Sequence, residues 1–465
     1  MRISRRGFLG GVAAAQIVRG MAGLRAGAAM VNITPTLGCS LAGGMRDNIA
    51  TEIHDELHVR GLVLDNGKTR IAMATIDSCA VPRNILDRAK EIIAKHTSMP
   101  ASHVLLSATH THSAPAATHL FQSQADPKYT DLLAVKIADC IRLCVTRLQP
   151  ARLGYGTGRE ERLVFNRRFY MKPGTIPSDP FGHTTDRVLM NPPAGSPNID
   201  RAAGLTDPEV SVLAVEALDG TPIAVYTSYA LHYVGGVGGG HISADYYGAW
   251  AESMQRLAGK QFVPILANAC SGNINGVNFL KPGTGVPPYF QMRKYADILA
   301  AESFRVWRTL EYSSDVELAA SIEELSLDTR LPSRDEVDAA TKQLGSRSGP
   351  YAGRADIYAR ETVIMAAEFP RQVKTFVQAL RIGAMGVATY PGEAFVELGL
   401  EAKARSPFKS TMLVELANDY RGYLPTVEGH ELGGYETWRA KSSYLEKLAA
   451  PKLVASAVRQ LGMLG

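Results

Sequence analysis

The sequence predicts an α/β fold, in which strands and helices alternate along one chain. From about Ala26 onward, short apolar runs alternate with longer segments whose apolar residues repeat at helical spacing. Such alternation is typical of β-sheets covered by helices. The 465-residue chain is long enough to bury a large core, and its 46% hydrophobic and 20% charged residues are typical of a compact globular protein.

The first part of the chain predicts a strand–helix–strand unit. Residues 62–64 and 71–76 are apolar and predict strands, 84–96 carries apolar residues on one helical face, and 104–107 returns to a strand pattern. Ligands in open α/β sheets bind beyond the carboxyl ends of the strands. We therefore expect the residues that follow 104–107 to belong to a functional site.

A Thr-His-Thr-His-Ser motif at 109–113 follows this strand directly. Because side chains alternate along a strand, we expect His110 and His112 to project to the same face and to converge on one metal ion or one substrate. The alternative is a strand end whose histidines only hydrogen-bond to their neighbours. Two histidines on one face, flanked by hydroxyl residues and a proline, favour the functional interpretation.

Later apolar runs also lead into polar residues at their ends. Helices are expected at 129–148 and 289–310, and strands at 223–226, 262–266, 382–389 and 412–416. We expect the strand ends to lie on one rim of a sheet, where residues distant in sequence can gather. The segment 170–204 is rich in Pro, Gly, Asp and Asn, and we interpret it as a lid or substrate loop; a mobile surface insertion is the alternative.

Three of the polar residues at these ends form the donor set of a hydrolytic metal centre. His110, His232 and Glu393 offer two nitrogens and one oxygen, which suit zinc and leave a position open for water. The glycines at 235–240 do not indicate a nucleotide site, because neither a Walker lysine nor a dinucleotide-binding pattern accompanies them. Two other classes of metal hydrolase with paired histidines fit poorly. The sequence after His112 lacks the Asp and His of the metallo-β-lactamase motif, and the chain lacks the eightfold repeat of barrel amidohydrolases.

The N-terminus predicts export by the twin-arginine (Tat) route. Twin arginines within 4–9 precede an apolar stretch that ends near Val18 and is too short to span a bilayer. We expect a signal peptide over 1–25, cleaved between Ala22 and Ala29, and a catalytic domain over 26–465. The Tat translocase would be a transient partner, the protein would be periplasmic or secreted, and no stable transmembrane anchor is expected.

Charge and cysteine content exclude several other classes. Residues 1–23 contain four arginines and no acid, so their removal lowers the formal net charge from +5 to +1. No basic cluster remains that would indicate a nucleic-acid partner. The five cysteines show no C-x-x-C spacing, and we expect no thiolate metal site.

Taken together, these segments resemble the catalytic domain of the neutral (non-lysosomal) ceramidases. The matching segments appear in family order at 26–28, 32–35, 109–113, 166–167, 232 with 242–245, 391–393, 417–423 and 435–436. The resemblance covers nearly the whole mature chain. It implies layered mixed β-sheets with flanking helices. In a departure from the family, we expect no C-terminal immunoglobulin-like domain, because the sequence stops thirty residues after Tyr435.

The resemblance also implies roles for individual residues. It implies zinc bound by His110, His232, Glu393 and the phenol oxygen of Tyr423. It implies substrate contacts and oxyanion stabilisers at His112, Arg167 and Tyr435. In addition, we expect Asp245 to orient a ligand histidine from outside the metal sphere.

One position departs from the family pattern. Asn275 stands where the family carries a catalytic serine, and an amide side chain is neither a nucleophile nor a base, although it can hydrogen-bond a carbonyl. We therefore expect a zinc-dependent hydrolase in which a metal-activated water cleaves an amide or ester bond of a small-molecule or lipid-like substrate. True ceramidase activity and a non-catalytic ligand-binding protein on the same fold are the alternatives.

Overall fold

The computed structural model describes residues 23–259, 261–283 and 285–465, so the twin-arginine pattern lies outside the described residues. The larger of two principal sheets has eight strands. In spatial order these are β16 (Val263–Asn268), β14 (Pro222–Tyr229), β13 (Glu209–Ala217), β8 (Gln149–Arg159), β1 (Arg25–Asn32), β5 (His58–Asp65), β6 (Arg70–Ile76) and β7 (Val104–Ala108). The smaller sheet has the order β18 (Leu318–Asp328), β19 (Gln372–Ile382), β20 (Met385–Thr389) and β22 (Ser410–Val414).

The larger sheet is divided into two halves between β1 and β8. The register joins these strands through two residue pairs, Arg25 with Pro150 and Ala26 with Gln149, whereas β1 and β5 pair along their whole length. Apolar side chains from both halves and from the smaller sheet meet in one central cluster. Three sheet faces therefore share a core, which explains why the strands are near-continuous apolar runs.

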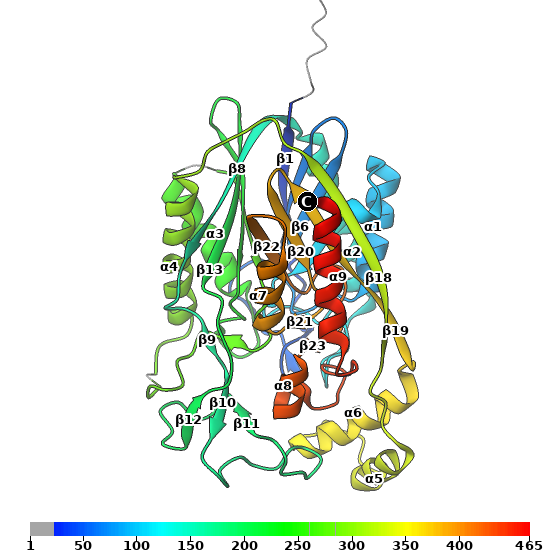
Figure 1. The fold of residues 1–465 in the computed structure, drawn as a ribbon. Helices are drawn as coiled ribbons and strands as arrows, with labels where there is room; N and C mark the ends of the chain where they lie inside the picture. The colour runs from blue at the N-terminus through cyan, green and yellow to red at the C-terminus, as the bar shows by residue number, and fades with distance from the viewer. Residues whose placement is uncertain (1–22, 260, 284) are drawn as a thin grey trace, which may run out of the picture.

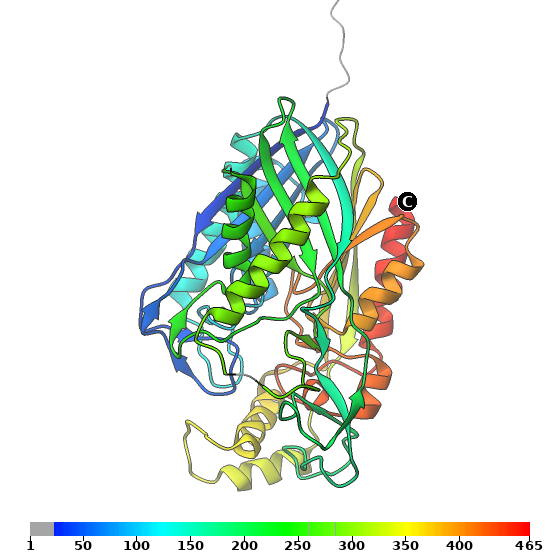
Figure 2. The ribbon, with the colours of Figure 1, turned by 90° about the vertical axis from the view of Figure 1, so that its left-hand side faces the viewer.

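Helices cover the outer face of each of these three layers (Figure 1, Figure 2). The pair α1 (Arg83–Thr97) and α2 (Pro127–Thr146) packs on β1, β5, β6 and β7. The pair α3 (Asp245–Ala258) and α4 (Phe290–Trp307) packs on the half that contains β13 and β14. The smaller sheet is covered by α7 (Val396–Arg405) and α9 (Ala449–Leu464). Layered mixed sheets with flanking helices are thus confirmed.

The remaining α-helices and the two-stranded sheets lie mainly around the lower end of the layers in Figure 1. The helices are α5 (Arg334–Leu344), α6 (Arg354–Glu368) and α8 (Val427–Leu432). The two-stranded pairs are β2 (Ser40–Leu41) with β3 (Asn48–Ile49), β4 (Glu52–Ile53) with β15 (His241–Ile242), β9 (Phe165–Asn166) with β17 (Ile274–Asn275), and β21 (Glu393–Ala394) with β23 (Tyr423–Leu424). In the part of the chain that the structure describes, no helix combines the length and apolarity needed to cross a membrane.

The predicted strand–helix–strand unit is confirmed as β6, α1 and β7, with β6 and β7 parallel. The two long predicted helices correspond to α2 and α4. The segment 170–204 is more regular than expected, because β11 (Val188–Met190) and β12 (Ile199–Ala202) flank β10 (Arg168–Met171) in a small antiparallel sheet. These strands are too short to produce a periodic signal among so many Pro and Gly residues.

The expectation of a single rim is wrong, because the strand ends belong to two sheets. β7, β14 and β16 lie in the larger sheet, and β20 and β22 in the smaller one. Their carboxyl ends meet where the sheets join: Ser107 bridges Ala417, and the Glu415 backbone N–H donates to the Asn268 carbonyl at 2.9 Å. The residues gather as predicted, but at a seam between layers.

Candidate metal centre and adjoining cavity

His110 lies in the loop after β7 and not on the strand. β7 ends at Ala108, and His110 has φ 73°, a left-handed conformation that is uncommon outside glycine. Its backbone N–H donates to the Ser78 carbonyl at 2.9 Å, which holds this conformation. Strand alternation is therefore the wrong reason for the pairing of the histidines. The turn nevertheless brings Nε2 of His112 to 3.2 Å from Nε2 of His110.

Three of the predicted metal ligands converge in the interior. Nε2 of His110 lies 3.1 Å from Nε2 of His232 and 3.3 Å from Oε2 of Glu393, and the His232–Glu393 distance is 3.8 Å. All three residues are at most 2% exposed, and their donor atoms are close enough together to hold one metal ion. Ligands about 2.0–2.1 Å from a tetrahedral zinc ion lie about 3.3 Å apart, so the spacing fits this ion.

Backbone carbonyls orient both imidazoles. Nδ1 of His110 lies 2.6 Å from the Cys79 carbonyl oxygen, and Nδ1 of His232 lies 3.2 Å from the Ser271 carbonyl oxygen. Each Nδ1–H can therefore donate to a carbonyl, which leaves the Nε2 lone pair directed at the cluster. Oε2 of Glu393 has no hydrogen-bond donor among the described residues. A buried carboxylate oxygen without a donor, facing two imidazole lone pairs, is the arrangement expected of a cation site.

The two ligand histidines differ in charge when no cation is bound. Burial, together with Arg167 and the neighbouring imidazoles, lowers the pKa of His232 well below its usual range, so this ring is neutral. Burial acts in the same direction on His110, but Glu393 and Cys79 together outweigh it and raise the pKa of His110, which favours a proton on this ring. A divalent cation would compete with that proton, as metal binding to histidine generally does.

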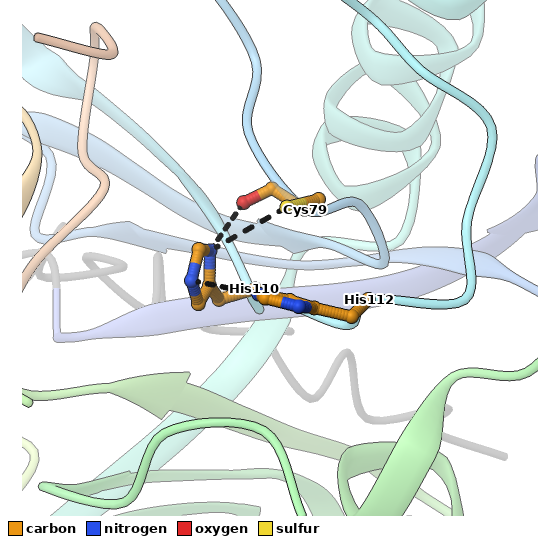
Figure 3. A group of neighbouring side chains, drawn as sticks. All are labelled: Cys79, His110 and His112. Carbon is orange, nitrogen blue, oxygen red and sulfur yellow. Dashed lines mark hydrogen bonds between the residues drawn. The ribbon is translucent and has the colours of Figure 1, made fainter. Parts of the chain in front are cut away.

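Cys79, for which the sequence suggested no role, lies close to His110 (Figure 3). Its Sγ lies 3.8 Å from Nδ1 of His110, and Cys79, His110 and His112 form a second group that could hold a metal ion. The two groups share His110. Because Nδ1 of this ring already faces the Cys79 carbonyl at 2.6 Å, we favour the group that uses its Nε2.

Tyr423 lies beside Glu393 because β21 and β23 pair these two residues in register. Its hydroxyl oxygen accepts a hydrogen bond of 3.0 Å from Nη2 of Arg167, whose Nε donates to Oε1 of Glu436 at 3.0 Å. A second phenol, Tyr420, was not singled out from the sequence, and it donates to Oε1 of Glu393 at 2.9 Å. Glu393 is thus held by one oxygen and leaves the other free for a cation.

Tyr435 and His112 complete the wall around the cluster. The ring of Tyr435 meets that of Tyr423 edge to face at 5.7 Å, and His112 stacks on Tyr233 with ring centroids 3.5 Å apart. A Cβ added to Gly43 would lie 2.4 Å from Cγ of His112, so the glycine permits this ring position. Burial, with a smaller effect of His110 and Arg167, lowers the pKa of His112 well below its usual range.

A cavity of about 450 Å³ adjoins the cluster. Arg167, His232, Tyr233, Asn275 and Asn191 are among its lining residues. Nδ2 of Asn275 donates to Oδ1 of Asn191 at 2.8 Å, and its Oδ1 accepts from the Val277 backbone at 2.9 Å. Asn191 lies within 170–204, so the segment interpreted as a lid or substrate loop contributes to the wall of the cavity.

Asp245 lies near His232 but does not contact its ring. The carboxylate accepts from the backbone N–H groups of Val234 at 3.2 Å and Gly235 at 2.8 Å, which follow His232 in sequence. Asp245, the first residue of α3, therefore holds the loop that carries the histidine, while the Ser271 carbonyl faces the ring.

Two solved structures share this architecture, although no protein-family model matches the sequence. Neutral ceramidase from Pseudomonas aeruginosa superposes with a TM-score of 0.73 at 19% identity, over 95% of this chain and 74% of that one. A ceramidase complexed with C2 gives a TM-score of 0.71 at 19% identity, over 95% and 75%. Identity at this level shows the fold, and the resemblance predicted from the sequence is confirmed at that level. The chain has the fold of the neutral ceramidases.

Proposed function

We propose that this protein is an exported, zinc-dependent hydrolase that cleaves an amide or ester bond. The observation that carries the proposal is the meeting of His110, His232 and Glu393, in which a buried carboxylate oxygen without a hydrogen-bond donor faces two imidazole nitrogens. His232 belongs both to this cluster and to the lining of the 450 Å³ cavity. A cation in the cluster would therefore be reached from the cavity.

The donor chemistry supports zinc. Two imidazoles and a carboxylate bind zinc in many hydrolases, and Tyr423 is placed next to Glu393 as a fourth donor. When bound, zinc acts as a Lewis acid and lowers the pKa of a coordinated water to about 7. We assign the remaining steps to the residues around it.

Arg167, His112 and Tyr435 are proposed to bind the substrate carbonyl and to stabilise the oxyanion that forms from it. Arg167 is cationic and lines the cavity, which suits it to stabilise a developing oxyanion. Burial keeps His112 neutral by lowering its pKa, and a neutral imidazole can donate a hydrogen bond to the substrate carbonyl. The phenol of Tyr435 stays protonated, because burial and Glu393 raise its pKa, and it can donate to the same oxyanion.

Asn275 favours attack by water over attack by a side chain. Its amide nitrogen and oxygen are both engaged, with Asn191 and Val277 respectively, and neither is nucleophilic. We propose that Asn275 helps to shape the cavity wall. A substrate smaller than ceramide is favoured because this cavity is in the size range of small-ligand pockets.

Ceramide hydrolysis is the second candidate, because the chain shares its fold with a neutral ceramidase. It predicts release of fatty acid from a fluorescent ceramide. The first candidate predicts turnover of shorter acyl amides, esters or lactones at a higher kcat/KM than ceramide. A substrate panel that contains all four classes distinguishes the two.

The proposal is tested by metal analysis together with that panel. The wild-type protein should contain one equivalent of zinc and lose activity on chelation. His232→Ala and Glu393→Ala should lose both metal and activity, whereas His96→Ala, at an exposed histidine on α1, should lose neither. Full activity after chelation, or no stoichiometric metal, would overturn the proposal. Tight ligand binding without turnover would indicate a binding protein instead.

Export is tested separately. Replacing Arg5 and Arg6 together with lysine should retain the protein in the cytoplasm of a Tat-competent bacterial host, because the twin arginines are the recognised signal. Unchanged export of the double variant would exclude the Tat route. The result would leave the hydrolase proposal untouched.

A further inference from the structure

Glu415 is a buried carboxyl group next to the cluster that the proposed reaction does not use. It follows β22 and is 0% exposed. Its Oε1 accepts a hydrogen bond of 2.6 Å from Oγ of Ser271, and its Oε2 accepts one of 2.7 Å from the backbone N–H of Ala394. Both donors belong to segments that determine where proposed metal ligands lie.

Each of the two hydrogen bonds leads to a different ligand. Ser271 presents its backbone carbonyl to Nδ1 of His232 at 3.2 Å, so its position determines the orientation of that imidazole. Ala394 is the residue after Glu393 on β21, so the position of its backbone helps to fix the backbone from which the Glu393 side chain extends. The Glu415 carboxyl group thus contacts two segments, each of which positions one proposed ligand. Those ligands, His232 and Glu393, are 161 residues apart in sequence.

The backbone around Glu415 reinforces this connection. The N–H of Glu415 donates to the Asn268 carbonyl at 2.9 Å, at the end of β16. The N–H of Leu416 donates to the Gly392 carbonyl at 3.2 Å, one residue before Glu393. The residues at 415 and 416 therefore lie between the larger sheet, which carries His232, and the segment that carries Glu393.

We infer that Glu415 is a positioning residue, which holds the Ser271 and Ala394 segments so that His232 and Glu393 keep the spacing that a metal ion requires. The inference rests on the proposed metal site, and it concerns the preformed geometry of the ligands. Residues that hold ligands from outside the metal sphere commonly change metal affinity by 10–100-fold when they are replaced.

Zinc affinity of the purified, metal-stripped protein provides the test, measured by competition with a chromophoric chelator. Glu415→Ala removes both acceptors and should weaken zinc binding about 10–100-fold. Glu415→Gln keeps the shape; its oxygen can accept from Ala394 and its amide can donate to the Ser271 hydroxyl, so affinity should stay within about threefold. The visible absorption of the cobalt-substituted protein should change in Glu415→Ala and be retained in Glu415→Gln.

Glu361 provides a matched control. It is also 0% exposed, and it is held in α6 by the Lys441 backbone N–H and by Arg360. Glu361→Ala should lower stability without changing zinc affinity, which separates a specific effect on the ligands from a general loss of packing. Equal losses of zinc affinity in Glu361→Ala and Glu415→Ala would overturn the inference.

A variant that keeps the carboxyl group covers the case in which Glu415→Ala does not fold. Ser271→Ala removes the Oγ donor and keeps the carbonyl, and it should weaken zinc binding at least fivefold. Zinc affinity within twofold of wild type in Ser271→Ala, or within threefold in Glu415→Ala, would overturn the positioning role. Failure of the wild-type protein to bind any zinc would instead overturn the proposed function, so the two failures are distinguishable.

Discussion

Arg167 lies in the proposed site and also forms a buried ion pair that should stabilise the fold. Its replacement by methionine should therefore lower the free energy of unfolding. Arg167 is 4% exposed, and its guanidinium forms a 3.0 Å ion pair with Glu436, which is itself 0% exposed. Although burial lowers the pKa of Arg167, Tyr423 and Glu436 outweigh it and raise that pKa. Breaking a buried ion pair from one side costs about 3–5 kcal/mol, because the remaining charge is uncompensated.

The structure places Arg167→Met at the low end of this range. Nε of Arg168 lies 3.4 Å from the other oxygen of Glu436, so the carboxylate keeps one cationic neighbour. We expect a loss of about 3 kcal/mol in the free energy of unfolding. The exposed pair Arg159–Glu161, with side chains 69% and 70% exposed, is the matched control, and Arg159→Met should cost less than about 1 kcal/mol.

Urea unfolding of wild type, Arg167→Met, Glu436→Gln and the double variant completes a double-mutant cycle. We expect a coupling energy of about 1.5–3 kcal/mol, because the two side chains are in direct contact. A coupling energy below about 0.5 kcal/mol, or a cost for Arg167→Met equal to that of Arg159→Met, would refute the reasoning. In that case the site would not depend on this ion pair for its geometry.

Three further predictions follow from buried or constrained positions. Burial lowers the pKa of Lys90 to about 8. Between pH 8 and the usual lysine pKa of about 10.4, Lys90 is protonated in the unfolded chain and neutral in the folded protein. From pH 7.5 to 9.5 the free energy of unfolding of wild type should therefore rise about 2 kcal/mol relative to that of Lys90→Met. If the unfolding free energy does not rise in this way, the Lys90 ammonium group is in contact with water. Gly43→Ala, at φ 114°, would place a Cβ against the His112 ring and should displace that ring. The variant should retain zinc, but its kcat in steady-state kinetics should fall about 100-fold. An unchanged kcat would exclude a role for the His112 ring. Because Leu24 is 2% exposed and β1 begins at Arg25, the structure favours cleavage before Leu24 over the cleavage after residue 25 that the sequence suggested, and mass spectrometry of the exported protein should find it there. A mature chain that begins at Ala29 or later would contradict the placement of β1 in the sheet.

His110, His232 and Glu393 are recognisable from the sequence as candidate metal ligands, because each follows an apolar run that forms a strand. β7, β14 and β20 are buried on both faces and therefore appear as apolar runs that end abruptly at polar residues. The donor types then restrict the chemistry to borderline cations. Tyr423, Arg167, Tyr435 and His112 were assigned through the family resemblance, and the structure places them beside this cluster.

Residues that act through long-range contacts were not identifiable in this way. Tyr420 and Glu415 have no motif, and their relevance arises from hydrogen bonds to Glu393 and to Ala394. Cys79 supports His110 through its backbone carbonyl, a group that every residue carries. Asp245 was expected to orient a ligand ring, but its carboxylate holds backbone N–H groups instead, a distinction that depends on a few ångströms of loop geometry.

Residue types and their spacing are enough to predict the class of the fold, the strand ends that carry polar residues and the types of proposed metal donors, because burial and hydrogen bonding constrain which residues can stand at each position. How those strand ends meet depends on the packing of the layers. Three sheet faces close on one core, the left-handed turn at His110 aims its ring, and Asn275 is engaged with Asn191 on the cavity wall. Such contacts join segments that are far apart in sequence, and their geometry depends on how the layers pack, which no local pattern encodes.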